Sequence, residues 1–285
     1  MNYCRNKAAN TFAVTASALL GMSASVQAAS KVEPADAICE AYASMQYPLT
    51  RTLIKKHPDL QEARLVKALT AVFDRRKQNL GYGLPELKKI YENNSFKKPL
   101  RIQAGLAYAR AGQTLQMRSG VYPQAEGIEF DPVYDGIISE YPTTSAACFA
   151  LIYQTEGWFC SGDEDMIAKA FAKLENFIQN YRGPGKYFSG LNIMLADRYI
   201  IHNRQYDKAV TRLVVALENG VSNPRTAELI SFQVGRIYDT QLGDHKQAKK
   251  YYERFIREYP NSGYVSIVQR YMKEMNEENI ANGGK

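Results

Sequence analysis

The chain has 285 residues, of which 45% are hydrophobic and 11 are proline, which excludes an intrinsically disordered protein and allows a sizeable buried core. Four cysteines are too few for a disulfide-dense scaffold, and three histidines far apart in sequence leave little for a His-rich metal site. The 36 Lys and Arg residues exceed the 29 Asp and Glu residues, and the net charge of +7 favours an anionic partner or surface.

The first 28 residues have the pattern of a secretory signal peptide. Arg5 and Lys7 give a positive start, 12–22 is mostly apolar, and Val26-Gln27-Ala28 fits the rule for cleavage after a small residue. The apolar run is about half of the ~20 residues that a membrane span needs, so we expect export and no stable membrane insertion. The sequence therefore predicts a periplasmic protein, most simply in a bacterium, whose mature chain starts at Ala29.

Three cysteines remain after this cleavage: Cys39, Cys148 and Cys160. Cys148 and Cys160 are closest in sequence, and a disulfide between them is feasible if the chain folds back after the helix that carries Cys148. The spacing does not force this bond, so which cysteines pair stays open. A catalytic cysteine is not indicated, because no histidine lies in a recognisable partner motif.

Apolar residues recur at helical spacing through nearly the whole chain, and no segment shows a convincing strand alternation. The first helices are expected over 35–45, 60–78 and 84–91, within an N-terminal helical segment that spans 29–96. Prolines stand mostly at expected helix starts or just past helix ends. The pattern predicts an all-α protein.

From residue 97 onward the helices repeat one pattern. A small residue is followed after three positions by tyrosine and then by Gly or Asn, in four copies: Gly105/Tyr108/Gly112, Ala150/Tyr153/Gly157, Ala196/Tyr199/Asn203 and Gly235/Tyr238/Gly243. The small residue lets a neighbouring helix approach, and Gly or Asn tolerates the left-handed conformation that ends a helix.

A second amphipathic helix follows each copy and carries one apolar set: Phe130/Tyr134/Ile137, Ala170/Leu174/Phe177, Ala209/Leu213/Ala216 or Ala248/Tyr252/Phe255. Three of the four second helices finish on a tyrosine, in Tyr141-Pro142, Tyr181-Arg182 and Tyr259-Pro260.

These residues resemble the tetratricopeptide repeat (TPR) family, in which a Leu-Gly-x-x-Tyr helix, a Gly turn and an Ala-x-x-x-Phe helix end on a proline. The best match is Val234-Gly235, Tyr238, Gly243-Asp244, Ala248, Tyr252, Phe255 and Pro260. The resemblance implies a TPR-like α-solenoid of antiparallel helix pairs over 97–280, with a C-terminal capping helix from 262 to about 278 and a flexible tail at 281–285. About twelve extra residues, 115–126, split the first unit.

The closing Tyr259-Pro260-Asn261-Ser262 resembles the repeat ends of exported bacterial envelope proteins. The periplasmic cell-division coordinator of the Tol-Pal system and the repeat-containing outer-membrane assembly lipoproteins are of this kind. The coiled-coil start of the first and the lipid-accepting cysteine of the second are both missing here.

Catalytic motifs are absent from the sequence, which has no His-Glu-x-x-His, no Gly-x-Ser-x-Gly and no phosphate-binding Gly-Lys-Ser/Thr loop. His57, His202 and His245 stand at expected turns or helix ends, where a solvated or capping role is usual. Asp163-Glu164-Asp165 could hold a cation, but acidic residues also start helices, where they face the positive end of the helix dipole. We predict no enzyme activity, no metal and no cofactor.

In the repeat family the first helix of each pair lines a concave surface that binds a partner. The resemblance therefore implies that seven side chains of this chain contact a partner: Leu151, Gln154, Ile193, Asp197, Phe232, Arg236 and Asp239. This mixed apolar and charged set suits a peptide or a partner helix, although some members could instead pack against the C-terminal helix. Trp158 could be an exposed aromatic anchor for a partner or could fill the core between units.

Two functions follow from these features. The first is an exported, non-catalytic protein-binding scaffold or adaptor of the bacterial cell envelope. The alternative is a peptidoglycan-binding or peptidoglycan-processing envelope factor, which the compartment and the acidic and aromatic residues in 156–165 motivate. Export disfavours nucleic acid as a partner.

Charge is unevenly distributed along the chain. Residues 51–118 contain 15 Lys/Arg and 5 Asp/Glu, a net +10, whereas 119–168 contain 9 Asp/Glu and no Lys/Arg. Residues 169–285 contain 18 Lys/Arg and 12 Asp/Glu, a net +6. We predict that this order steers a partner, or a second copy of the chain, into one orientation.

Overall fold

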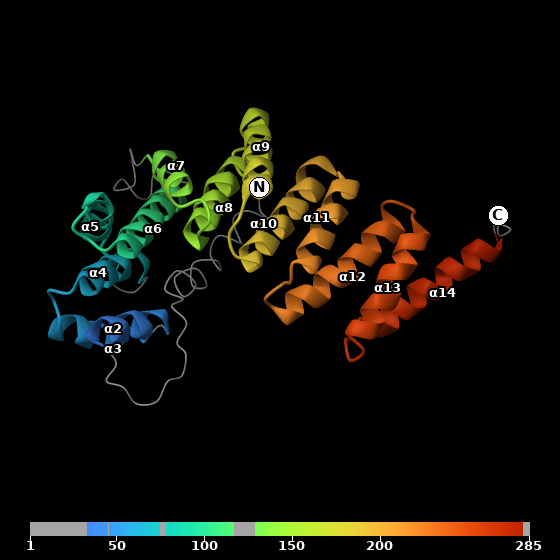
Figure 1. Ribbon diagram of the computed structural model, residues 1–285, viewed down its shortest axis with the longest axis horizontal. Coiled ribbons are helices and arrows are strands. Elements are labelled where there is room, and N and C mark those ends of the chain that lie inside the picture. The colour runs from blue at the N-terminus through green and yellow to red at the C-terminus, as the bar shows by residue number, and fades with distance from the viewer. Residues whose placement is uncertain (1–32, 45, 75–77, 117–128, 282–285) are drawn as a thin grey trace. The chain divides into compact units, whose positions relative to one another are not determined.

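A computed structural model of the protein describes residues 33–44, 46–74, 78–116 and 129–281. These residues form helices and no strand, which confirms the predicted all-α class (Figure 1). The expected signal peptide, nearly all of the tail and most of the extra residues 115–126 lie outside the described residues.

The chain divides into two compact units, Met1–Ala170 and Phe171–Lys285. Helix α9, Glu164–Asn180, spans the point of division. The helices before it are α2 (Pro34–Ala43), α3 (Tyr47–Lys56), α4 (Gln61–Phe73), α5 (Leu80–Glu92), α6 (Lys98–Gln116), α7 (Asp131–Glu140) and α8 (Ser145–Phe159). Those after it are α10 (Gly185–Arg198), the π-helical turn η2 (Tyr199–Asn203), α11 (Tyr206–Glu218), α12 (Pro224–Thr240), α13 (His245–Glu258) and α14 (Val265–Ala281).

In the first unit, α6 is the central helix and packs on α4, α5, α7 and α8. Its buried residues contribute to two apolar clusters, one with the helices before it and one with α7 and α8. Helices α5 and α6, which lie on either side of the predicted boundary at 96/97, therefore share a core.

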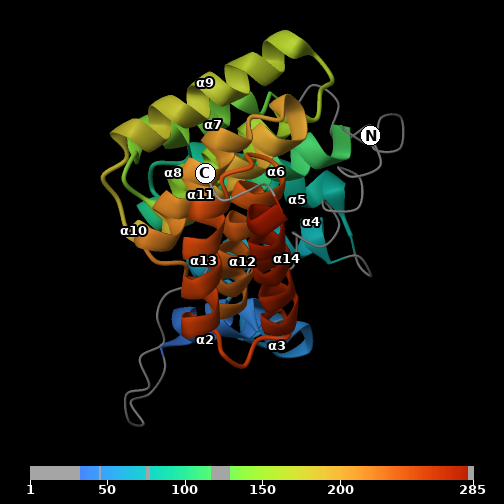
Figure 2. The same cartoon turned by 90° about the vertical axis from the view of Figure 1, so that its right-hand side faces the viewer.

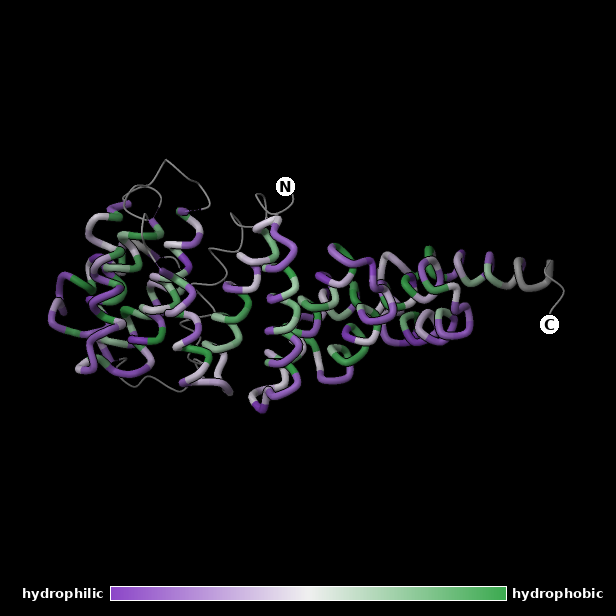
Figure 3. The backbone as a smooth tube through the Cα atoms, turned by 90° about the horizontal axis from the view of Figure 1, so that it is seen from above, coloured by the Kyte–Doolittle hydropathy of each residue, from purple (hydrophilic) through white to green (hydrophobic). Residues whose placement is uncertain are grey.

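In the second unit, α10 pairs with α11 and α12 pairs with α13, as the repeat pattern predicts. Helices α12, α13 and α14 lie side by side in Figures 1 and 2, around a cluster made of Ala248, Tyr252, Phe255, Val268 and Met275. Each helix presents hydrophobic and hydrophilic residues in alternation, which Figure 3 shows along the tube. The outward side of α14 carries the exposed ion pairs Arg270–Glu274 and Lys273–Glu277, so this last helix presents a polar surface to solvent, as a capping helix does.

The small residues of the repeat allow close helix contacts where the sequence predicted them. A Cβ atom on Gly235 would lie 2.5 Å from the ring of Tyr252 on the paired helix α13. A Cβ atom on Gly105 would lie 2.5 Å from the ring of Tyr91, which comes from the preceding helix α5. The small residue of the motif thus makes room for the following helix at Gly235 and for the preceding helix at Gly105.

The predicted helix ends are right at one copy of the motif. Gly243, the third residue after the end of α12, has a left-handed φ of 64°. In the third copy, however, the left-handed residue is Arg204 and not Asn203, because the π-helical turn adds one residue before the stop. Gly112 and Gly157 lie inside α6 and α8, where Gly157 makes room for the side chain of Gln113.

The predicted disulfide between Cys148 and Cys160 is not formed in this structure. Helix α8 runs without a break from Ser145 to Phe159, and Cys160 follows as its C-cap. Twelve residues at 1.5 Å per residue separate the two α-carbons by ~18 Å, whereas a disulfide needs them within ~7 Å. The fold-back on which the prediction depended does not occur.

Candidate partner-binding surface

Three of the predicted contact residues are buried in the first unit. Leu151 and Gln154 have no exposed surface, and Trp158 is 5% exposed. Trp158 Nε1 donates a hydrogen bond to Asp131 Oδ2 at 3.1 Å, and the Lys169 ammonium lies 4.5 Å from its ring centroid. Of the two roles considered for Trp158, the structure therefore gives the core-filling one, and a partner could reach these three side chains only by displacing what covers them.

Beside them lies a buried polar cluster between α6 and α8. Arg110 Nη2 donates to Glu156 Oε2 at 3.0 Å and Nη1 donates to Gln113 Oε1 at 3.0 Å, while the guanidinium lies 4.5 Å from the ring centroid of Tyr153. Gln113 Nε2 in turn donates to the Tyr153 carbonyl at 2.8 Å. These groups satisfy one another, so the cluster holds the helices together.

The predicted residues of the second unit are more accessible. Ile193 and Asp197 on α10 are half-buried, and Arg236 on α12 is exposed. Phe232 stacks on Tyr264, with ring centroids 4.7 Å apart, and Arg236 lies 5.9 Å from the ring of Tyr271 on α14. The alternative in which part of the set packs toward the C-terminal helix therefore holds for Phe232, and in part for Arg236 through Tyr271.

Asp239 has a structural role. Its Oδ2 accepts a hydrogen bond from the hydroxyl of the fully buried Tyr252 at 3.1 Å, and its Oδ1 lies 3.3 Å from His245 Nδ1. This carboxylate joins α12 to α13. Burial and the nearby Asp239 raise the pKa of Tyr252 far above its usual range, so the hydroxyl keeps its proton and donates this bond.

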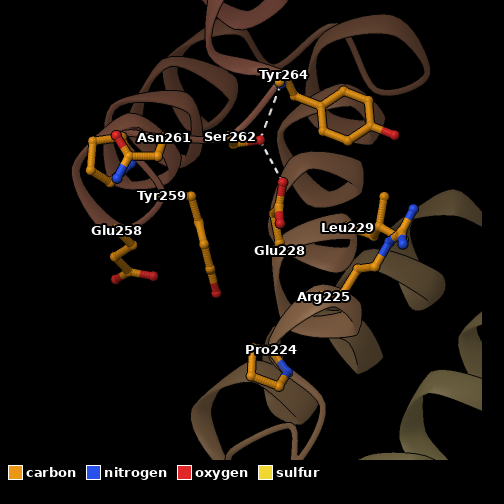
Figure 4. A pocket seen from close by; sticks show the side chains of 11 residues that line it. Pro224, Arg225, Glu228, Leu229, Glu258, Tyr259, Asn261, Ser262 and Tyr264 are labelled. Carbon is orange, nitrogen blue, oxygen red and sulfur yellow. Dashed lines mark hydrogen bonds between the residues drawn. The ribbon is translucent and has the colours of Figure 1, made fainter.

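A cleft of about 620 Å³ opens at the N-terminal end of α12 (Figure 4). The first turns of α12 form one wall and the loop between α13 and α14 forms the other. The lining residues are Pro224, Arg225, Glu228 and Leu229 on the first wall and Glu258, Tyr259, Pro260, Asn261, Ser262, Gly263 and Tyr264 on the second. Its size is that of ordinary small-ligand and peptide pockets.

Helix caps fix both walls of this cleft. Asn223 caps α12 by accepting hydrogen bonds from the N–H groups of Arg225 and Thr226. Ser262 Oγ accepts a bond from Tyr264 N at 3.1 Å and donates one to Glu228 Oε1. Ser262 therefore starts the last turn before α14 and also ties the loop to α12.

A tetratricopeptide repeat family model matches residues 231–262, which cover the end of α12, all of α13 and most of the cleft loop. This segment is therefore similar to a tetratricopeptide repeat. No curated protein and no solved structure matches the chain. The repeat carries Gly235 against Tyr252, the left-handed Gly243 and the closing Tyr259-Pro260, so its pattern and its packing agree.

The tetratricopeptide repeat thus contributes one wall of the cleft, from its closing motif. Sequence reasoning used Tyr259-Pro260-Asn261-Ser262 as a sign of the family but did not name it as a site. A sequence pattern that could have identified the cleft is a tyrosine in the turn after α13 together with charged residues near the start of the preceding helix, α12. That pattern depends on knowing that the end of α13 lies beside the start of α12.

The remaining sequence candidates have structural roles or none. Asp163 Oδ1 accepts from the N–H groups of Asp165 and Met166, so this acidic run begins α9. His57 ends α3, and burial together with Arg198 lowers the pKa of His202. Among the described residues, no group of three or more His, Cys, Asp or Glu side chains could hold a metal ion. No helix in the described ranges is long and apolar enough to cross a membrane.

Proposed function

We propose that this chain is an exported, non-catalytic scaffold of the bacterial cell envelope that binds a protein partner through its helical repeats. The observation that carries the proposal is the tetratricopeptide repeat at 231–262 with an open cleft at its closing turn. Stacked helix pairs of this kind present extended binding surfaces, and the repeat family is generally one of protein-interaction modules.

The partner in this proposal is a peptide or a helix of an envelope protein. It contacts the exposed Arg236 and the half-buried Ile193 and Asp197, which lie on the first helices of their pairs. The signal-like first 28 residues support the envelope location, with cleavage after Ala28. The peptidoglycan alternative relied on the compartment and on acidic and aromatic residues in 156–165. Trp158 and Phe159 there are 5% and 3% exposed, so this alternative receives no support from an exposed sugar-stacking ring.

Site-specific photo-cross-linking in living cells tests the proposal. A photoreactive amino acid at position 236 should give a discrete cross-linked protein, because Arg236 is exposed on the binding face. The matched control is position 253, an exposed residue on the opposite side of α13 from its buried Ala248, Tyr252 and Phe255. Equal cross-linking at both positions, or none at position 236, would contradict the proposal. Cell fractionation and sequencing of the mature N-terminus test the location separately.

A further inference from the structure

Two interhelical turns, which with the helix start beside each we call corners, share one sequence pattern. Glu140-Tyr141-Pro142-Thr143-Thr144 closes α7 in the first unit, and Glu258-Tyr259-Pro260-Asn261-Ser262 closes α13 in the second. Thr144 Oγ1 accepts a hydrogen bond from Ala147 N at 3.3 Å, as Ser262 Oγ accepts one from Tyr264 N. In both turns the hydroxyl residue also donates its backbone N–H to the tyrosine carbonyl, so the two turns are built alike, although Thr144 caps α8 whereas Ser262 lies three residues before α14.

The residue that faces each turn differs in charge. Lys98, at the start of α6, precedes Gly105 by the same seven residues by which Glu228, near the start of α12, precedes Gly235. In the first corner the Lys98 ammonium lies 4.3 Å from the ring centroid of Tyr141. The first corner thus holds a cation of its own chain over the tyrosine ring.

In the second corner the corresponding position holds a carboxylate and the space beside the tyrosine is open. Tyr259 packs on Phe255, with centroids 5.4 Å apart, and Figure 4 shows its side chain and that of Glu228 at the same opening. Glu228 Oε1 accepts the bond from Ser262, while Oε2 has no hydrogen-bond partner among the residues that the structure describes. The ring, this oxygen and the partly exposed Leu229 are available to a ligand.

The charge around the opening also favours a cation. Glu228 and Glu258 line it, and Glu258 is paired with Arg254 at 2.7 Å. Arg225, the cation among the lining residues, lies beside Leu229 in Figure 4, with Glu228 between it and Tyr259 in that view. A ligand cation at Tyr259 therefore meets an unneutralised carboxylate and an aromatic ring.

We propose that this cleft binds a Lys or Arg side chain of a partner polypeptide, with the cationic head between the Tyr259 ring and Glu228 Oε2. The aliphatic stem of that side chain lies against the apolar part of the lining next to Tyr259, to which Pro260 contributes. The inference rests on the proposed function, since it names the chemistry by which a protein partner is recognised. Lys98 on Tyr141 is the same contact made within the chain.

An NMR titration of the isotope-labelled mature chain tests the cleft directly. The probes are acetyl-Ala-Lys-Ala-amide and the same tripeptide with norleucine or Glu in place of Lys. The Lys probe should shift the amide signals of 225–229, 258, 259 and 261–264 with a dissociation constant on the order of 1 mM, because one cation–π contact and one charge-assisted hydrogen bond hold it. The norleucine probe should bind at least about fivefold more weakly, because it lacks both contacts.

Variants of Glu228 make the test specific. Glu228→Gln should weaken the Lys probe by about fivefold, and Glu228→Lys should abolish its binding because the new ammonium occupies the Tyr259 ring as Lys98 occupies Tyr141. Glu253→Lys is the matched control, with the same charge change at an exposed site on the outer side of α13, and should leave binding unchanged. Unchanged binding in Glu228→Lys, or tighter binding of the Glu probe than of the Lys probe, would overturn the inference.

The cross-linking experiment separates this inference from the proposed function. If the chain captures a partner at position 236 and Glu228→Lys reduces that capture, both stand. If Glu228→Lys leaves the capture unchanged, the cleft is not the recognition site and the scaffold proposal survives. If no partner is captured while the Lys probe still binds the cleft, the scaffold proposal fails and the cleft chemistry stands.

Discussion

The helix triples α6–α7–α8 and α12–α13–α14 share a pattern of apolar residues but differ in where their charged residues lie. Each has a fully buried tyrosine on its middle helix, Tyr134 or Tyr252, whose ring lies 6.4 Å or 6.1 Å from a tyrosine of the third helix. In the first triple the polar groups turn inward, with the buried Arg110–Glu156 pair and Lys98 over its own turn. In the second they face the surface, and a cleft takes the place of the lysine.

This difference suggests how one repeat unit becomes structural and another becomes a binding unit. The backbone and the apolar positions are kept, and a few charged residues decide whether a corner is filled from within or left open. The closing tyrosine and the hydroxyl residue three positions later occur in both triples. In our proposal, the residue that faces the turn decides whether the corner can bind a cationic side chain.

Breaking the inward network should have the largest effect. Arg110→Met removes one partner of an ion pair whose side chains are 11% and 23% exposed, and so leaves Glu156 charged and half-buried. We expect a loss of about 3 kcal/mol in the free energy of unfolding, because a buried charge without its partner keeps its desolvation cost. Urea denaturation followed by circular dichroism measures it.

The matched control for this variant is Arg254→Met in the second triple. Arg254 and Glu258 pair at 2.7 Å, but each side chain is 36% exposed. The expected loss is at most about 0.5 kcal/mol, because solvent screens an exposed pair. Equal losses in the two variants would show that the inward network does not distinguish the triples.

The glycine contacts should respond differently as well. Gly235→Ala places a methyl group 2.5 Å from the ring of the fully buried Tyr252, which has no room to move. We expect about 2 kcal/mol of destabilisation, since overpacking outweighs the gain in helix propensity. Gly105→Ala meets the half-buried Tyr91, which can shift, and should cost roughly half as much.

Gly190→Ala on α10 is the control for the glycine series. Gly190 is exposed, and a Cβ atom there would meet nothing within 4 Å. This variant should gain ~0.5–1 kcal/mol from helix propensity alone. Thermal unfolding of the three variants side by side gives the ranking, and a loss in Gly190→Ala would invalidate the packing explanation for the other two.

The sequence predicted those parts of the fold in which the apolar face of a helix determines its packing. The apolar spacing and the small-x-x-Tyr motif gave the helix pairs of the second unit and the close approach at Gly235. Helix α3, Tyr47–Lys56, was missed because it is short, has only Leu49, Leu53 and Ile54 as aliphatic residues, and leaves Leu49 46% exposed. The π-helical turn after α10 was missed because one added residue leaves no mark in a periodic pattern.

The candidate site was less predictable because it depends on contacts between distant residues. Spacing alone could not tell that Leu151 and Gln154 are enclosed, since the family pattern gives the helix face but not what covers it. The cleft needs Glu228 beside Tyr259, residues that lie on different helices. The sequence marked Tyr259-Pro260 as a repeat ending, and the fold then showed what faces it.

The buried tyrosines differ in their hydrogen-bond acceptors, which allows a third comparison. Tyr252→Phe should cost about 1.5 kcal/mol, because its hydroxyl donates to the charged Asp239. Tyr134→Phe should cost less than about 1 kcal/mol, since the Gln113 Oε1 that accepts its hydroxyl at 3.3 Å also receives a bond from Arg110. Urea denaturation measures both, and a larger loss in Tyr134→Phe would reverse the assignment of the stronger bond.

The smallest expected effect sharpens the comparison most, because it converts one corner into the other. Lys98→Glu removes the ammonium from the Tyr141 ring and puts a carboxylate in the position that Glu228 holds in the second triple. Its stability should fall by no more than about 1 kcal/mol, since Lys98 is exposed and such contacts are weak at exposed sites.

The same variant should gain a weak site for acetyl-Ala-Lys-Ala-amide, seen as new amide shifts at 140, 141, 143 and 144, with affinity no higher than that of the Glu228 cleft. Lys98→Met is the control, because it empties the ring face without adding a carboxylate, and it should bind the probe more weakly than Lys98→Glu. If neither variant shifts these signals, the identity of the facing residue is not sufficient to open a corner, and the shape of the cleft at α12 must be part of what makes the second triple a binding unit.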